Sequence, residues 1–111
     1  MIYELYETEE FKKKFEKEIP INIQKNFRKQ IKKLKYSPFG KGKPLGTKFL
    51  RELKIKGFRV YYLIYKNKLI VILVSASNKK NQKEVIKKLK EDRELIKEFI
   101  KNPNFFKTKY L

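Results

Sequence analysis

The sequence has 111 residues and contains neither cysteine nor histidine. Without cysteine the chain forms no disulfide and offers no thiolate, which fits a reducing compartment. Without histidine it cannot build Ser-His-Asp or Cys-His catalytic sites, and it lacks the commonest ligand of protein-bound metals. We therefore expect neither a metal nor a cofactor.

Acidic residues are almost absent from the middle of the chain, although the net charge of +18 still includes 12 Asp and Glu. Residues 1–20 hold six Glu and four Lys, whereas residues 21–83 hold 18 basic residues and a single acid, Glu52. A strongly basic segment indicates a polyanionic partner, while a lysine-rich genome is the alternative explanation. One acid cannot support a two-metal carboxylate nuclease, so catalysis must rest on Lys, Arg, Tyr or Ser.

The chain also lacks a long apolar run. The longest, residues 69–74, is far too short to span a bilayer. The first residues carry acids and not the basic stretch of a signal peptide. We expect a cytoplasmic protein with no membrane partner, and the length indicates one domain over residues 1–111.

Hydrophobic periodicity predicts a strand at residues 2–7, two helices, three strands within residues 51–77 and a last helix beginning at 78–82. Thr8 is the expected N-cap of the first helix. The two helices carry apolar stripes that should form a hairpin packed on the sheet: Phe11, Phe15 and Ile19, then Ile23, Phe27, Ile31 and Leu34. The glycine-rich loop at residues 36–46 has no phosphate-loop spacing and is interpreted as a connector.

The stretch 51–77 organises the rest of the chain. Because strand side chains alternate, one face should pack on the helices and the other should present Lys54, Lys56 and Arg59 beside Tyr61. Cations on a rigid sheet form a phosphate-binding surface. The alternatives are a cross-strand pair of Arg59 with Glu52, a solvated face for the lysines, and simple packing for Tyr61.

Several segments resemble the RelE/ParE superfamily of bacterial and archaeal toxins. Residues 5–11 look like its opening strand and helix start, and residues 36–45 are similar to its loop after the second helix. Residues 50–62 resemble its central hairpin, particularly in HigB-like "addiction module killer" proteins, and residues 77–84 resemble the entry to its last helix. The resemblance implies an α+β fold in the order β-α-α-β-β-β-α, with a helical hairpin on a mainly antiparallel four-stranded sheet. Residues 91–111 would be a C-terminal helical extension.

The resemblance also implies a function, the toxin of a type II toxin–antitoxin pair. RelE-like members cleave messenger RNA on the ribosome by attack of the ribose 2′-hydroxyl on the neighbouring phosphate, without metal. The family's basic hairpin residues carry over onto Lys54, Lys56 and Arg59 as catalytic residues. Further expected RNA contacts are Arg51, Tyr61, Lys79, Lys80, Lys83, Lys41 and Lys43. The implied partners are an acidic, RelB-like antitoxin, held in a hetero-oligomer, together with messenger RNA and the ribosome.

The sequence departs from the RelE pattern at three places, one of which is that residues 91–111 extend past the usual end of the family. A tyrosine often found near the final helix is missing, because Val85 and Ile86 stand there and Tyr110 is distant. Glu52 occupies a position where some RelE members have lysine. Two other functions therefore stay open, inhibition of DNA gyrase as in ParE-like relatives and RNA binding without catalysis.

Overall fold

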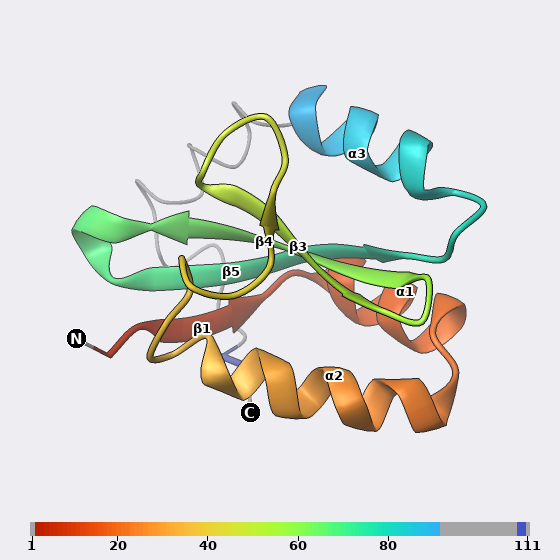
Figure 1. Ribbon diagram of the computed structural model, residues 1–111, viewed down its shortest axis with the longest axis horizontal. Coiled ribbons are helices and arrows are strands. Elements are labelled where there is room, and N and C mark those ends of the chain that lie inside the picture. The colour runs from red at the N-terminus through yellow and green to blue at the C-terminus, as the bar shows by residue number, and fades with distance from the viewer. Residues whose placement is uncertain (1, 92–108, 111) are drawn as a thin grey trace.

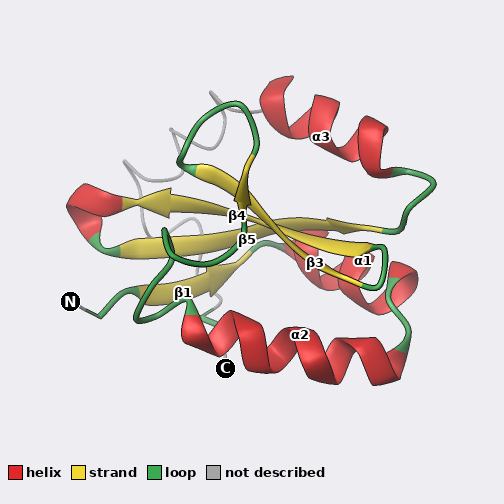
Figure 2. Ribbon diagram, viewed as in Figure 1, coloured by secondary structure: helices red, strands yellow, loops and turns green. Residues whose placement is uncertain are grey.

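The computed structural model describes residues 2–91 and 109–110. A twisted sheet forms the centre, with α1 and α2 against one face and α3 against the other (Figures 1 and 2). The elements are β1 (Glu4–Glu7), α1 (Glu9–Glu18), α2 (Ile21–Lys33), β2 (Lys43–Pro44), β3 (Leu50–Ile55), β4 (Phe58–Tyr65), the short 3-10 helix η1 (Lys66–Lys68), β5 (Ile70–Ser77) and α3 (Gln82–Glu91). None of the helices in this described part is long and apolar enough to cross a membrane.

The sheet has five strands in the order β1-β5-β4-β3-β2, where four were predicted. β1 runs parallel to β5 and all other neighbours are antiparallel, so the prediction of a mainly antiparallel sheet is confirmed. The additional strand, β2, pairs Lys43 with Glu52 and Pro44 with Arg51. Its two residues show no alternation, and proline is found only at sheet edges, so the sequence resembles a loop there.

The helical layer follows the predicted stripes. Thr8 caps α1, because its Oγ1 accepts a hydrogen bond from the backbone N–H of Phe11 at 3.1 Å. The rings of Phe15 and Phe27 meet edge to face, with centroids 6.2 Å apart, and this contact joins α1 to α2. Phe27 is completely buried, as are Ile31 and Leu34. The two stripes form one apolar core with the facing residues of the sheet.

The second face of the sheet is covered as well. Val85 and Leu89 of α3 are buried in a cluster with Tyr61, Leu63 and their strand neighbours. The face expected to present Lys54, Lys56 and Arg59 beside Tyr61 is therefore covered by α3 over most of its apolar positions, Tyr61 included. What stays exposed is the end of the sheet that carries Lys54.

The end of the chain returns to the first strand. The backbone N–H of Tyr110 donates to the carbonyl of Leu5 at 3.0 Å, and its ring lies against Phe11. Tyr110 is thus docked on the core. The predicted helical extension falls almost wholly on residues outside the described part and, like the single-domain assignment, stays a prediction.

Candidate functional site

The tip of the β3–β4 hairpin is a two-residue turn. Lys56 and Gly57 both have positive φ, 49° and 88°, as a type I′ turn requires. Strand β3 ends at Ile55, so Lys56 lies in the turn and not on the strand face predicted for it. Lys54 remains on the strand, opposite Arg59, and both lysines are exposed.

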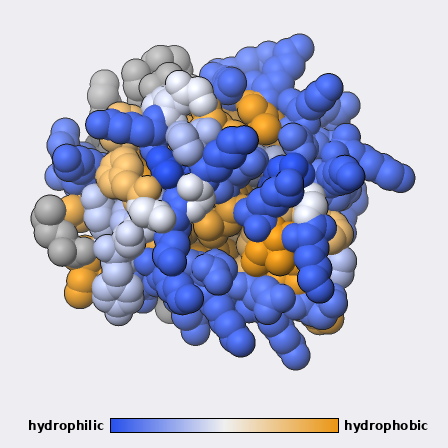
Figure 3. Space-filling model, in the orientation of Figure 1, coloured by the Kyte–Doolittle hydropathy of each residue, from blue (hydrophilic) through white to orange (hydrophobic). Residues whose placement is uncertain are grey.

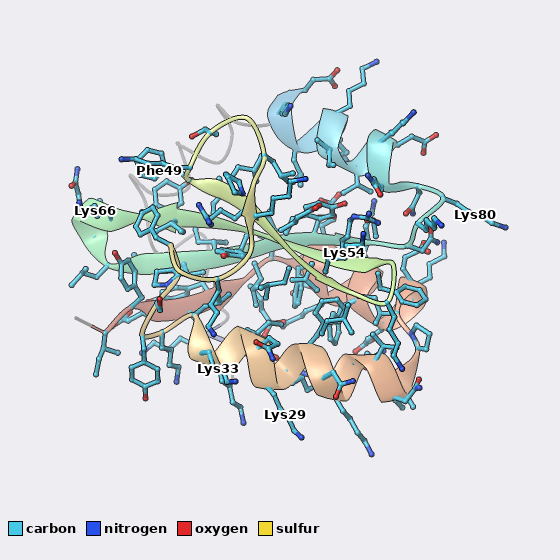
Figure 4. All side chains as sticks on the ribbon, viewed as in Figure 1. Lys29, Lys33, Phe49, Lys54, Lys66 and Lys80 are labelled. Atoms are coloured by element: carbon cyan, nitrogen blue, oxygen red, sulfur yellow. The ribbon has the colours of Figure 1, made fainter. Side chains whose placement is uncertain are left out.

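The hairpin tip and the β5–α3 connection lie at the same end of the sheet (Figure 1). Arg59 of β4 pairs with Ser77, the last residue of β5. Figure 4 shows Lys54 and Lys80 at this end of the molecule and Lys66 at the opposite end. The structure therefore brings the hairpin cations close to the basic segment that follows β5.

Strand register adds Lys43 to this group. Lys43 lies opposite Glu52, and Glu52 lies opposite Tyr61. Directly opposed residues share a face of the sheet, and so do residues two apart along a strand. Lys43, Lys54 and Arg59 are therefore on one face around Glu52, the only acid between residues 21 and 83.

Arg59 and Glu52 form a buried ion pair. Nε of Arg59 is 3.5 Å from Oε2 of Glu52, and each side chain is 9% exposed. Nη1 of Arg59 also donates to the carbonyl of Gly57 at 3.0 Å. Among the described residues, neither Nε nor Oε2 has a hydrogen-bond partner. The cross-strand alternative for Arg59 is thus confirmed, but the pair is incompletely satisfied, which is costly for buried charges.

Tyr61 lies beneath α3 and is fully buried. Its hydroxyl is 2.7 Å from Oγ of Ser77. Burial raises the pKa of Tyr61 above its ordinary value, so the phenol keeps its proton at neutral pH. Tyr61 is therefore a packing residue, which was the alternative to its predicted RNA contact. Its buried hydroxyl cannot reach an RNA strand and cannot act as a base.

Arg51 is on the other face of the hairpin. Its three nitrogens donate to three backbone carbonyls: Nε to Lys41 at 3.1 Å, Nη1 to Lys48 at 3.1 Å and Nη2 to Gly42 at 3.2 Å. These bonds hold the loop before β3 and thereby position β2. Every nitrogen of Arg51 is engaged, so its predicted RNA contact has no support in this arrangement. Lys41 contributes its carbonyl to this loop, and its side chain is half-buried.

Two asparagines shape the segment after β5. Oδ1 of Asn78 accepts from the backbone N–H groups of Lys80 and Asn81, at 2.8 and 3.0 Å, and Oδ1 of Asn81 accepts from the Asn78 N–H at 2.9 Å. Nδ2 of Asn78 donates to Glu18 at the end of α1. This network fixes the backbone that carries Lys79 and Lys80, whose side chains are exposed, as is that of Lys83 in α3. The asparagine pair is an Asx turn that the sequence analysis missed.

The charges of the site are suited to binding anions. Within the part of the chain that the structure describes, no group of three or more His, Cys, Asp or Glu side chains could hold a metal ion. Exposed ammonium groups beside a partly satisfied guanidinium can instead bind phosphate oxygens and neutralise charge that develops on them.

No protein-family model and no curated protein matches the sequence. Several solved structures, in contrast, match the structure of the chain. The toxin–antitoxin complex RelBE2 of Mycobacterium tuberculosis contains a chain that aligns with a TM-score of 0.60 and 18% identity, covering 70% of this chain and 99% of that one. A free mutant of the Escherichia coli toxin RelE gives a TM-score of 0.63 and 18% identity, covering 75% of this chain and 90% of that one. The fold is that of the RelE toxins.

An archaeal RelE–RelB complex from Pyrococcus horikoshii also has the RelE fold, with a TM-score of 0.57 and 18% identity over 72% of this chain and 98% of that one. The RelE fold confirms the predicted architecture and the family resemblance at the level of structure. At these identities the likeness establishes the fold alone. The narrower HigB-like placement stays a prediction.

Proposed function

We propose that this protein is the toxin of a toxin–antitoxin pair and that it cleaves messenger RNA engaged by the ribosome. The observation that carries the proposal is the end of the sheet, where exposed Lys54 and Lys56 flank Arg59 in a RelE fold. The excess of 18 basic residues over one acid in residues 21–83 supports an RNA substrate.

The proposed reaction is an internal transesterification. The ribose 2′-oxygen attacks the adjacent phosphorus, the bond from phosphorus to the 5′-oxygen breaks, and the products are a 2′,3′-cyclic phosphate and a 5′-hydroxyl. The phosphate gains negative charge in the transition state. Arg59, Lys54 and Lys56 stabilise that charge, which requires no metal.

Two protons must also move in this reaction. Oε2 of Glu52 is buried beside Nε of Arg59 and is not open to a substrate, so exposed Lys56 is the proposed acceptor of the 2′-hydroxyl proton. The ammonium of Lys54 can donate a proton to the departing 5′-oxygen. Tyr61 does not serve in this proton transfer, because its hydroxyl is buried and hydrogen-bonded to Ser77.

The proposed partner is an acidic antitoxin of the RelB type, bound in a hetero-oligomer in the cytoplasm. Two of the three solved structures named above are toxin–antitoxin complexes, RelBE2 and an archaeal RelE–RelB complex. The basic middle of this chain offers such a partner a complementary surface. A pull-down from the native host should recover a small acidic protein, and recovery of none would count against the pairing.

The experiment that tests the proposed function is primer extension on a messenger RNA engaged by translating ribosomes. We expect discrete cuts with the purified protein, none without ribosomes, and none with the Lys54→Ala/Lys56→Ala/Arg59→Ala variant. The matched control is Lys66→Ala/Lys68→Ala, which removes exposed cations at the other end of the sheet and should cut normally.

Each alternative function predicts a different result. An absence of cuts together with loss of gyrase supercoiling would favour the ParE-like activity. An absence of cuts with salt-sensitive RNA binding would favour a non-catalytic RNA-binding module. Cuts that persist in the triple variant would show that the end of the β3–β4 hairpin with Lys54, Lys56 and Arg59, here called the hairpin end, is not the site of cleavage.

A further inference from the structure

The two helices of the α1/α2 layer differ in the charge of their outer surfaces. α1 carries four Glu and four Lys, whereas α2 carries five basic residues and no acid. Both helices bury one apolar stripe against the sheet, so packing does not explain the difference. The basic surface of α2 is not part of the hairpin-end site, because it faces away from the sheet.

The lysines of α2 form a row. Lys25, Lys29 and Lys33 follow each other at intervals of four residues, about 6 Å along the axis, and Lys32 stands beside the last of them. All four are exposed. Figure 4 shows Lys29 and Lys33 pointing outward from the helix, and Figure 3 shows hydrophilic side chains along the edge where α2 runs.

An aromatic ring ends this row. Tyr36 is 69% exposed, one of three large hydrophobic residues so exposed among those described. Its backbone N–H donates to the carbonyl of Lys33 at 3.1 Å, so the helical turn continues to Tyr36 and places it three residues after Lys33. A line of cations beside an exposed ring is the arrangement that binds single-stranded nucleic acid, with phosphates on the cations and a base on the ring.

These side chains have no role within the described structure that would account for them. Like charges spaced by four residues destabilise a helix, and no ion pair with a described residue relieves the four lysines. Arg28, the remaining cation of α2, differs from them. Its guanidinium lies 5.1 Å from the ring centroid of Phe15, and Nη1 lies 3.5 Å from the hydroxyl of Tyr110. Arg28 therefore interacts with two residues of the core, Phe15 and Tyr110, whereas the four lysines have no such interaction among the described residues.

We propose that Lys25, Lys29, Lys32, Lys33 and Tyr36, here called the α2 patch, bind a single strand of RNA. The α2 patch and the hairpin end lie on opposite sides of the molecule, since Lys54 shares the sheet face that α3 covers. The α2 patch is therefore a second RNA contact that would hold the protein on an RNA-rich target. It does not depend on whether the hairpin end cleaves RNA.

The test is binding of a fluorescent 12-nucleotide oligouridine, measured by anisotropy at several salt concentrations. The four-lysine variant is Lys25→Gln, Lys29→Gln, Lys32→Gln and Lys33→Gln. Its matched control is Lys13→Gln, Lys17→Gln, Lys66→Gln and Lys68→Gln, which removes the same charge from exposed positions elsewhere. The α2 variant should lower the slope of log K against log salt by about 3, since each phosphate contact contributes about 0.7, while the control should change it little.

Substitutions of Tyr36 distinguish binding of RNA from binding of other polyanions. Tyr36→Ala should weaken oligouridine binding about fivefold or more, and Tyr36→Phe should not, because stacking requires the ring and not the hydroxyl. Repeating the series in a Lys54→Ala/Lys56→Ala protein keeps the two surfaces apart, since the α2 effects should persist there. Equal slopes for the α2 variant and the control would overturn the proposal. So would full binding by Tyr36→Ala with equal displacement by oligoglutamate, which would make the patch a surface for acidic proteins.

Discussion

Arg51 and Arg59 stand on neighbouring strands of one hairpin, and each is 8% exposed, yet their guanidinium groups are held in opposite ways. Arg51 donates to three backbone carbonyls and has no unused nitrogen. Arg59 donates to one carbonyl and faces Glu52 through an Nε that makes no hydrogen bond among the described residues. A fully satisfied arginine holds a loop, whereas an incompletely satisfied one can exchange its partner for a phosphate.

The tyrosines beside them repeat this contrast. The hydroxyl of Tyr62 lies 2.9 and 2.8 Å from the carbonyls of Pro38 and Lys41, in the loop that Arg51 also holds. The hydroxyl of Tyr61 meets Ser77 at the site end of β5. One face of the hairpin therefore anchors the chain, and the other carries the candidate site.

Among the substitutions that test this contrast, Arg51→Ala should have the largest effect on stability. Three carbonyls lose a charged donor, and the substitution should lower the free energy of unfolding by about 4 kcal/mol. Urea unfolding followed by circular dichroism measures this. No single second substitution should restore the loss, because the acceptors belong to the backbone. A loss below about 1 kcal/mol would show that Arg51 does not hold the loop.

Arg59→Ala should cost somewhat less stability, about 3 kcal/mol, since it leaves the Glu52 carboxylate buried without its partner. Glu52→Gln added to Arg59→Ala should restore most of that loss by removing the unpaired charge. Thermal unfolding of the two variants gives the difference directly. A double variant no more stable than Arg59→Ala would contradict the assignment of the ion pair as the cause.

Features that depend on neighbouring residues in the chain could be predicted from the sequence, whereas features that depend on distant residues could not. The stripes of α1 and α2, the Thr8 cap and the alternation of β4 follow from local spacing, and the structure has them. Strand β2 could not be predicted, because Lys43 and Pro44 form a strand only through pairing with β3. The role of Arg51 depends on the same distant loop.

The sequence predicted the strand register of Lys54 and Arg59 but not the details of the hairpin around them. Lys54 and Arg59 face each other across the hairpin as the alternation required, and Arg59 pairs with Glu52, which was one of the two alternatives. Lys56 was assigned to a strand because residues 53–56 alternate, but the positive φ that precedes Gly57 ends the strand first. Tyr61 is buried because α3 folds over it, and no local pattern reports that contact.

Substitution of Tyr61 or Tyr62 should lower the free energy of unfolding less than the arginine substitutions do, and the effect should depend on pH. Burial raises the pKa of both Tyr61 and Tyr62 above the value near 10 of an unfolded chain. The stability that they contribute is present below pH 10 and is lost as pH rises through their folded pKa values. Tyr62→Phe and Tyr61→Phe should each cost about 1 kcal/mol at pH 7 and make unfolding above pH 10 less steep. Exposed Tyr36→Phe is the control, and equal steepness in all variants would contradict this account.

The smallest effect on stability is expected for Lys54→Gln and Lys56→Gln. Both side chains are exposed, so each change should stay within about 0.5 kcal/mol of the parent in urea unfolding. RNA binding should nevertheless lose salt dependence, by about 0.7 in slope for each lysine. Large destabilisation by either change would mean that these lysines are structural, as Arg51 is.

The central claim is that the Arg59 side of the hairpin performs the chemistry, and the rate of ribosome-dependent cleavage under single-turnover conditions tests it most directly. Arg59→Ala, compared with the parent at a temperature where both are folded, should cleave at least about 100-fold more slowly. A rate within threefold of the parent, with the variant fully folded, would contradict the claim and place the reaction elsewhere on the molecule.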